Sequence, residues 1–199
     1  MASVIAGTTM SLDGFIADPN GGVELLYSDF SNLQGSAYMT STIAQTGAVI
    51  MGRKTFAMGD PDSYVGAYEF QVPIFVVTHH PPRIAPKQDE RLTFTFVSDG
   101  VELAVAQAKA AAGDKAVQVV GGASVIRQLL AAGLVDELHI DIMPVLLGDG
   151  LRLLESLDPA RVRLHKQEVL EVGARTCLRF RVGAWMGMGS EPPITRQFV

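Results

Sequence analysis

Residues 117–130 read VQVVGGASVIRQLL, and this stretch decides the fold. The apolar run over residues 117–120 predicts a buried strand, and the apolar spacing that follows predicts a helix. Gly121 and Gly122 lie at the junction, where residues without side chains let a ligand approach the backbone closely. The free N–H groups at the start of a helix favour an anion. The stretch therefore predicts a strand–turn–helix unit that holds a phosphate, with a plain tight turn as the alternative.

A second strand-to-helix junction carries positive charge. Residues 47–52 read GAVIMG, a predicted buried strand, and Arg53-Lys54-Thr55-Phe56 follows at a predicted helix start. An Arg offers a planar fork to phosphate oxygens, and a Lys offers a point charge. The helix dipole disfavours cations at this end. Their presence indicates an anionic ligand, and the alternative is a solvated helix start.

Two further segments complete the pattern. Residues 3–17 predict a strand, a turn at Asp13-Gly14 and a short apolar stretch. In this order and spacing, the sequences SLDGFIA, VIMGRKTF and VVGGASVIRQLL resemble the dihydrofolate reductase-like fold. The pattern VDELHI followed by PVLLGDG, over residues 135–150, is similar to the reductase domain of bacterial riboflavin biosynthesis, the C-terminal half of a bifunctional deaminase-reductase. The resemblance covers roughly residues 3–182, and four ordered motifs are more specific than one.

The alternation of strands and helices predicts an α/β fold with a mostly parallel central sheet and helices on both faces. Asp99, with Glu102 three residues later, has the form of a capping box for one helix. A C-terminal antiparallel hairpin is expected over residues 162–171 and 174–182, with its turn at Gly173. The other expected strands lie near 3–10, 47–51, 73–78, 93–97, 117–120 and 136–143, and the expected helices near 33–45, 53–58, 99–112 and 122–132.

Composition is that of one globular domain. The chain has 199 residues, of which 48% are apolar, and a net charge of −5, which argues against nucleic-acid binding. The lone Cys177 excludes an internal disulfide framework and fits a cytoplasmic location. No apolar run is long enough to span a membrane. We divide the chain into a reductase domain over 1–182 and a tail over 183–199. With Trp185, Met186 and Met188 in the tail, we expect a homodimer.

The resemblance implies that NADPH lies across the carboxyl ends of the strands, as ligands do in open α/β sheets. It places the 2′-phosphate near Thr78, His79 and His80, with an exposed polar loop as the alternative. Arg53 favours NADPH over NADH, because the extra phosphate rewards a bidentate partner. No metal is expected. The implied cofactor-binding residues are Ile16, Ala17, Gly52, Arg53, Lys54, Thr55, Thr78, His79, Val120, Gly121, Gly122, Ala123, Ser124 and Val125.

The proton donor is less constrained. Alternation along residues 136–143 places His139, Asp141 and Met143 on one face of the strand, and we assign Asp141 to the substrate side. Asp13 and water are the other candidates. The carboxylate with which dihydrofolate reductases grip a pteridine would fall near Ser36, where there is no acid. Asp29 lies earlier, before the predicted helix, so folate reduction is disfavoured unless a shifted helix brings Asp29 to that position.

The function implied by the resemblance is that of an NADPH-dependent reductase similar to 5-amino-6-(5-phosphoribosylamino)uracil reductase. The chain departs from the family in two ways. It has no Cys/His/Glu zinc motif for a deaminase. It also has no convincing second cationic cluster for a substrate phosphate, for which Arg152 is the best single candidate. The alternatives are a same-fold reductase of another carbonyl, imine or pterin, and a nucleotide-binding module without catalysis.

Overall fold

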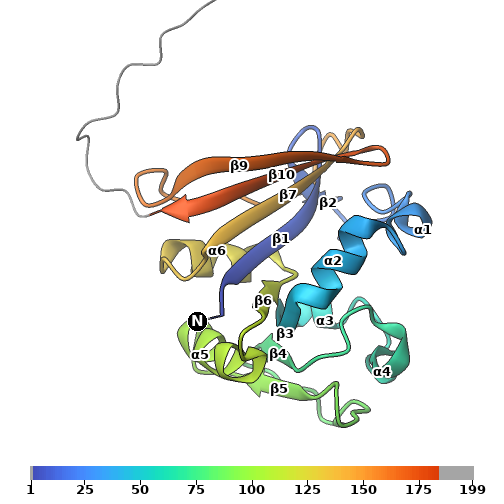
Figure 1. Ribbon diagram of the computed structural model, residues 1–199, viewed down its shortest axis with the longest axis vertical. Coiled ribbons are helices and arrows are strands. Elements are labelled where there is room, and N and C mark those ends of the chain that lie inside the picture. The colour runs from blue at the N-terminus through green and yellow to red at the C-terminus, as the bar shows by residue number, and fades with distance from the viewer. Residues whose placement is uncertain (1, 184–199) are drawn as a thin grey trace, which may run out of the picture.

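The computed structural model of the protein describes residues 2–183 (Figure 1). Within these residues, eight strands form one sheet in the order β5-β4-β3-β6-β1-β7-β10-β9. Neighbours from β5 to β7 are parallel, and β10 and β9 join one edge as an antiparallel hairpin. The bounds are β1 Val4–Ser11, β3 Thr46–Gly52, β4 Ile74–Val77, β5 Phe94–Val97, β6 Ala116–Val119, β7 Glu137–Met143, β9 Arg163–Val172 and β10 Arg175–Gly183.

Helices and short elements connect these strands. Two very short strands, β2 Phe15–Ala17 and β8 Leu151–Arg152, pair with each other beside the main sheet. The helices in the described part of the chain are α1 Phe30–Leu33, α2 Ala37–Gln45, α3 Arg53–Phe56, the 3₁₀ turn η1 Pro61–Ser63, α4 Tyr64–Ala67, α5 Val101–Ala112 and α6 Ala123–Ala131.

The helices cover both faces of the sheet. Leu138 and Ile140 of β7 pack in one core with buried side chains of α5 and α6. Asp141, the next residue along β7, accepts a hydrogen bond from Tyr38 of α2. Because successive side chains of a strand point to opposite faces, α2 lies on the face opposite α5 and α6. The predicted α/β architecture, with its C-terminal hairpin, is confirmed.

Each face has its own core. The α5/α6 side is aliphatic, with the small side chains of Ala104 and Ala108 bringing α5 close to the sheet. On the other side, beneath β3 and β4, aromatic rings dominate: Phe56 lies 5.7 Å from Tyr64 and 5.4 Å from Phe94, centroid to centroid. Burial of such rings is a large favourable contribution to folding. These cores hold the carboxyl ends of the parallel strands in a common row.

The structure has two helices, α1 and α2, where the sequence predicted one. The expected helix near 33–45 is interrupted after α1, because Gly35 adopts a left-handed φ of 80°. Ser36 then caps α2, its hydroxyl accepting a hydrogen bond from the Met39 amide at 3.1 Å. The position near Ser36, where the sequence comparison placed the carboxylate of dihydrofolate reductases, is thus a helix cap in this chain.

The prediction that Asp99 caps the next helix is wrong. Gly100 occupies the cap position of α5 with φ 101°, and no side chain bonds the free amides there. The positive φ of Gly100 favours glycine, and it places this residue, not Asp99, at the helix start. The short elements β2, β8, η1 and α4 were not predicted, because two to four residues carry too little periodicity.

Of the predicted tail over 183–199, Gly183 is the last residue of β10, and residues 184–199, with Trp185, Met186 and Met188, lie outside the described residues. Among the residues that are described, no helix has both the length and the hydropathy needed to cross a membrane.

Candidate functional site

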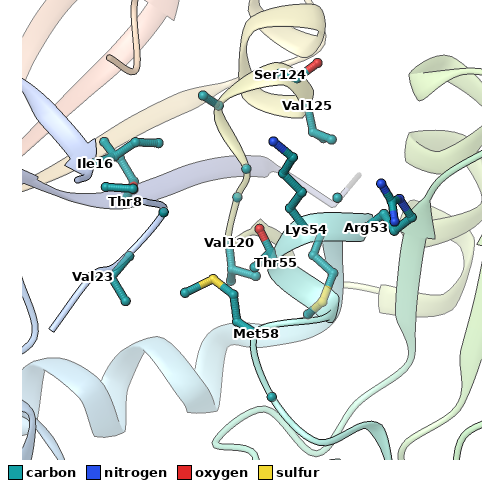
Figure 2. A pocket seen from close by; sticks show the side chains of 18 of the residues that line it. Thr8, Ile16, Val23, Arg53, Lys54, Thr55, Met58, Val120, Ser124 and Val125 are labelled. Atoms are coloured by element: carbon teal, nitrogen blue, oxygen red, sulfur yellow. The ribbon is translucent and has the colours of Figure 1, made fainter. Parts of the chain in front are cut away.

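A cavity of about 1420 Å³ opens at the carboxyl ends of the parallel strands. Lining residues in the ranges 51–55, 77–80, 97–100 and 120–128 form one side of it. Lining residues in the ranges 16–34 and 58–69 form the other side. Figure 2 shows Arg53, Lys54 and Thr55 of α3 facing the start of α6, with Ile16 and Thr8 across the opening. This is the edge at which open α/β sheets bind their ligands.

The two glycine junctions meet inside this cavity. The Gly52 amide donates a hydrogen bond of 2.9 Å to the Gly121 carbonyl. Gly121 has φ 131°, which favours glycine, and a Cβ there would lie 3.1 Å from the Thr55 hydroxyl oxygen. The Gly121–Gly122 peptide bond is cis. Bare backbone thus lies between α3 and α6, where a ligand can reach the amides at the start of α6.

Charge is unevenly distributed over the lining. We call the part formed by lining residues in the ranges 51–55, 77–80, 97–100 and 120–128 the cationic half. It contains Arg53, Lys54 and Arg127 with the imidazoles of His79 and His80. Within the described residues, these segments contribute no Asp or Glu side chain to the lining. Such a donor set suits a polyanion such as a dinucleotide.

The residues expected to bind the cofactor all line this cavity. They come from four separate junctions, after β1, β3, β4 and β6, and the parallel sheet brings them to one edge. His80 joins them, its amide bonded to the Thr78 hydroxyl at 3.0 Å. The lining residues that were predicted are Ile16, Ala17, Gly52, Arg53, Lys54, Thr55, Thr78, His79, Val120, Gly121, Gly122, Ala123, Ser124 and Val125.

The two proposed acids do not line the cavity. Asp13 instead ties its turn to a distant loop: its carboxylate accepts hydrogen bonds from the Ser11 hydroxyl at 2.6 Å and the Gly148 amide at 2.7 Å. The Ser11 hydroxyl, followed by the Gly148 and Leu147 amides, lowers the pKa of Asp13 to about 2. At neutral pH the group is an ionised structural carboxylate without a proton to donate.

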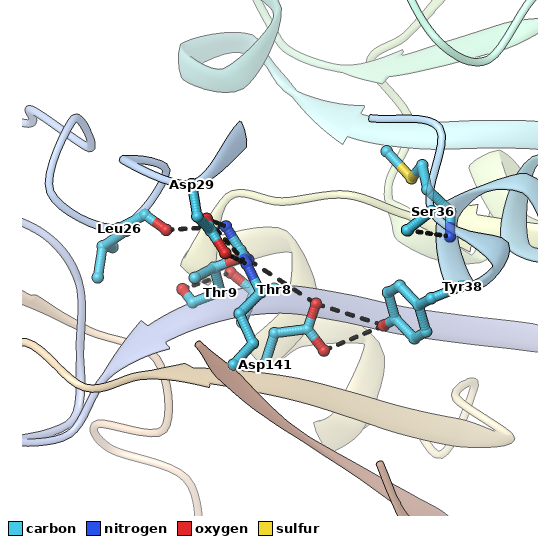
Figure 3. Close-up of polar contacts among 9 residues, drawn as sticks. Thr8, Thr9, Leu26, Asp29, Ser36, Tyr38 and Asp141 are labelled. Carbon is cyan, nitrogen blue, oxygen red and sulfur yellow. Dashed lines mark hydrogen bonds and ion pairs between the residues drawn. The ribbon is translucent and has the colours of Figure 1, made fainter. Parts of the chain in front are cut away.

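Asp141 lies beneath α2 on the sheet. Its carboxylate accepts the Tyr38 hydroxyl at 3.0 Å, and its side chain is 14% exposed. Figure 3 shows it between Tyr38 and the group around Asp29. Burial, with the charge of Asp141 next, raises the pKa of the neighbouring Cys177 to about 12. The structure places Asp141 behind the cavity wall, in a polar network rather than on the cavity surface.

The centre of that network is Arg175, which the sequence analysis did not single out. Its guanidinium is fully buried and forms a two-pronged pair with Asp29, at 2.9 Å from Nε and 2.6 Å from Nη2. It also donates to the Thr9 hydroxyl and the Leu26 carbonyl, and lies 3.9 Å from Asp141. The Arg175 hydrogen bonds lower the pKa of Asp29. The only signal in the sequence is an Arg placed directly after the hairpin turn.

The other charged residues noted in the sequence are engaged elsewhere. The Arg152 guanidinium stacks 4.2 Å over the Phe15 ring and donates to the Asp13 carbonyl at 3.2 Å. No group of three or more His, Cys, Asp or Glu side chains in residues 2–183 is arranged to hold a metal ion.

The fold and this cavity define a protein of the dihydrofolate reductase-like class. Residues 2–178 match the family model of the RibD C-terminal domain, and the chain belongs to that family. YwjB of Bacillus subtilis is 30% identical over 149 residues, covering 74% of this chain and 80% of YwjB. YyaP of the same organism is 27% identical over 158 residues, covering 74% and 77%.

Solved structures share the fold at lower identity. A protein from Shewanella sp. PV-4, described as a riboflavin biosynthesis protein, has a TM-score of 0.71 at 21% identity, with 91% of this chain and 99% of that chain covered. The Thermotoga maritima diaminohydroxyphosphoribosylaminopyrimidine deaminase/5-amino-6-(5-phosphoribosylamino)uracil reductase has a TM-score of 0.66 at 15% identity, covering 90% of this chain and 56% of that one. The chain thus spans about half the length of that bifunctional protein.

Proposed function

We propose that this protein is an NADPH-dependent reductase of a small molecule. The observation that carries the proposal is the cationic half of the cavity, where Arg53 and Lys54 of α3 lie beside the bare backbone of Gly52 and Gly121, and the lining residues include no acid. A dinucleotide with an added 2′-phosphate matches that charge. Membership of the RibD C-terminal domain family supports reductase chemistry. A cytoplasmic location belongs to the same proposal.

The residues present fit the cofactor. The amides from Gly122 to Ser124 would hold the pyrophosphate at the start of α6, and Thr78 and His79 would lie beside the 2′-phosphate. Ile16 and Ala17 would close over the nicotinamide, which supplies the hydride when bound. A Cβ at Gly52 would lie 3.1 Å from Val125, so this wall also depends on a missing side chain.

In the reaction, the protein orients the bound molecules and excludes water from the reacting carbon. Ile16, Val23 and Met58 give the middle of the cavity apolar walls, which exclude water from the reacting carbon (Figure 2). The proton comes from a water molecule, because neither Asp13 nor Asp141 lines the cavity. We therefore place Asp141 in a supporting role, in which it positions Tyr38 and α2.

Two substrate classes follow. One is the phosphoribosylaminopyrimidine named for the Thermotoga reductase, and the other is an unphosphorylated carbonyl, imine or pterin compound. The engagement of Arg152 with Phe15 and the Asp13 carbonyl favours the second, because it removes the best candidate for gripping a substrate phosphate. A nucleotide-binding module without catalysis would bind NADPH and turn over neither class.

Calorimetric titration with NADPH and NADH tests the cofactor. One charge-assisted contact is worth about 1.5–3 kcal/mol, so NADPH should bind about ten- to a hundredfold more tightly. Arg53→Ala should narrow that preference, whereas Arg91→Ala, on an exposed loop, should not. Equal affinity for both nucleotides in the wild-type protein would remove the 2′-phosphate from the proposal. Mass spectrometry of co-purifying small molecules would identify the substrate class.

A further inference from the structure

The cavity has a second half with the opposite charge. We call the lining from residues 16–34 and 58–69 the acidic half. Its ionisable carboxylates are Asp60 and Glu69. Within the described residues, these segments contribute no Lys, Arg or His side chain to the lining. A cofactor in the cationic half would leave the acidic half for the substrate.

Of the two acids, Glu69 is available to a ligand. Asp60 caps η1, where its carboxylate accepts the Ser63 hydroxyl at 2.9 Å and the Asp62 amide at 3.2 Å. The half-buried Glu69 carboxylate has no partner among residues 2–183 beyond its own backbone amide. Burial raises the pKa of Glu69. A partly buried carboxylate without a partner is costly for the free protein, and a donor or cation on a ligand would relieve that cost.

Two cations outside the cationic half cannot serve a phosphate in the acidic half. The Arg175 guanidinium lies 5.3 Å behind the Tyr27 ring, but its side chain is fully buried and already paired with Asp29. The Arg152 guanidinium is held over Phe15 and is not part of the lining. With Arg53 and Lys54 engaged by the cofactor, a phosphate in the acidic half would lose its hydration and meet Glu69 without a compensating cation.

The walls of the acidic half are flat and apolar. Tyr27 and Phe30 meet edge to face at 6.4 Å, and Tyr64 and Tyr68 have ring centroids 5.0 Å apart. Met58, 58% exposed, adds a thioether to the same lining. Aromatic and thioether groups of this kind favour a planar ring as ligand, and their faces also attract cations.

We infer that the substrate is an unphosphorylated planar heterocycle, neutral or cationic, which presents an N–H donor to Glu69. This inference rests on the proposed reductase function and names the substrate class of the same cavity. It departs from the phosphoribosyl compound of the Thermotoga relative, because that substrate needs a second cationic cluster. Glu69 then acts as a specificity-determining residue that contacts the substrate away from the reacting carbon.

Two flat probes of similar shape and opposite charge test the inference. Benzamidine carries a planar amidinium with N–H donors, and phenyl phosphate carries a phosphate on the same ring. Each is titrated calorimetrically into protein saturated with NADP⁺, so that the cationic half is filled. Benzamidine should bind more tightly than phenyl phosphate. Glu69→Gln should weaken benzamidine about ten- to a hundredfold, the scale of one charge-assisted hydrogen bond.

Asp60→Asn is the matched control, because it changes an acid of the same half that is already engaged in capping η1. It should leave benzamidine affinity within about twofold, since rim charges contribute little. Phenyl phosphate binding as tightly as benzamidine, equal losses in both variants, or no benzamidine binding would each overturn the inference.

The outcome is separable from that of the cofactor proposal. If NADP⁺ itself does not bind, the reductase function fails. Benzamidine titration of the nucleotide-free protein and of Glu69→Gln still decides whether Glu69 recognises a donor. Turnover gives a second readout: with NADPH present, a dephosphorylated ribosylaminopyrimidine should have a higher kcat/KM than its 5′-phosphate. The reverse order would contradict the inference.

Discussion

Gly122 is the residue at which the role of the backbone can be isolated. Gly121 needs its positive φ of 131°, so any substitution there also strains the fold. Gly122 has an ordinary φ of −81°, and a Cβ would meet only the Thr55 hydroxyl oxygen, at 3.4 Å. A substitution at Gly121 therefore changes backbone strain and ligand access together, whereas a substitution at Gly122 changes ligand access alone.

Gly122→Ala should keep the melting temperature and weaken NADPH binding by at least about tenfold, because the added methyl group enters the space of the phosphate. Calorimetry and thermal unfolding measure the two effects. Gly183→Ala is the control, since its Cβ would make ordinary contact with His165 at 3.6 Å, away from the cavity lining. Unchanged NADPH affinity in Gly122→Ala would reduce the glycine pair to a turn.

Asp13 makes stability depend on pH in acid. Its folded-state pKa of about 2 lies below the ordinary value of 3.8, because the Ser11 hydroxyl and the Gly148 amide bind the ionised form. The contribution is therefore fully present above about pH 4 and is lost as the pH falls towards 2. Urea unfolding across that range should show a smaller loss in Asp13→Asn than in the wild type. Parallel curves would mean that other carboxylates dominate.

At the scale of elements, the Asp29–Arg175 pair joins α1 to the C-terminal hairpin. Asp29 lies at the start of α1, and Arg175 begins β10. The pair is nearly enclosed, with exposures of 13% and 0% for the two side chains. The ion pair thus anchors the wall of the acidic half that contains Tyr27 and Phe30 to β10.

Asp29→Asn should destabilise the protein by about 3–5 kcal/mol, because it leaves a buried guanidinium without its main counter-charge. Asp158→Asn is the comparison, since Asp158 pairs with Arg161 on the surface at 3.9 Å. That variant should cost no more than about 1 kcal/mol. Urea unfolding at neutral pH measures both, and equal costs would show that Asp141 or solvent takes over from Asp29.

Elements of local origin were predictable, and contacts between distant residues were not. The junctions at Gly52 and Gly121–Gly122 carry their signal within a few residues, so a phosphate-binding edge could be predicted from strand, glycine and helix patterns. The rest of the predicted lining was implied by the resemblance to the family. The Arg175–Asp29 pair spans 146 positions, and nothing near either residue indicates its partner. The partner of Asp13, at Gly148, is equally remote. The Asp99 cap failed because a capping box does not reveal the φ of the next residue.

At the scale of the whole molecule, the hairpin leaves an apolar surface. Leu164 is 39% exposed and Val169 is 50% exposed. They pair in register with Val182 and Leu178, so all four side chains share one face of the β9–β10 edge. We propose that a second copy of the chain covers this face, as expected for a homodimer.

Light scattering at micromolar concentration should therefore give the mass of a dimer. Val169→Glu should shift the mass towards that of the monomer, because a charge at an apolar interface is costly. Ile84→Glu, at an 85% exposed position outside the sheet, should not change it. A wild-type monomer at that concentration would refute the proposal.

The position of Arg175 also bears on synthesis. Ribosomes deliver a chain from its N-terminus, so segments become available in the order of the sequence. The cationic half is built largely from residues 46–131, so its strands and helices leave the ribosome well before the hairpin does. The counter-ion of Asp29, Arg175, is synthesised 146 residues after it. In the growing chain we therefore expect the residues of the cationic half to be available before the wall that contains Tyr27 and Phe30 is anchored to β10.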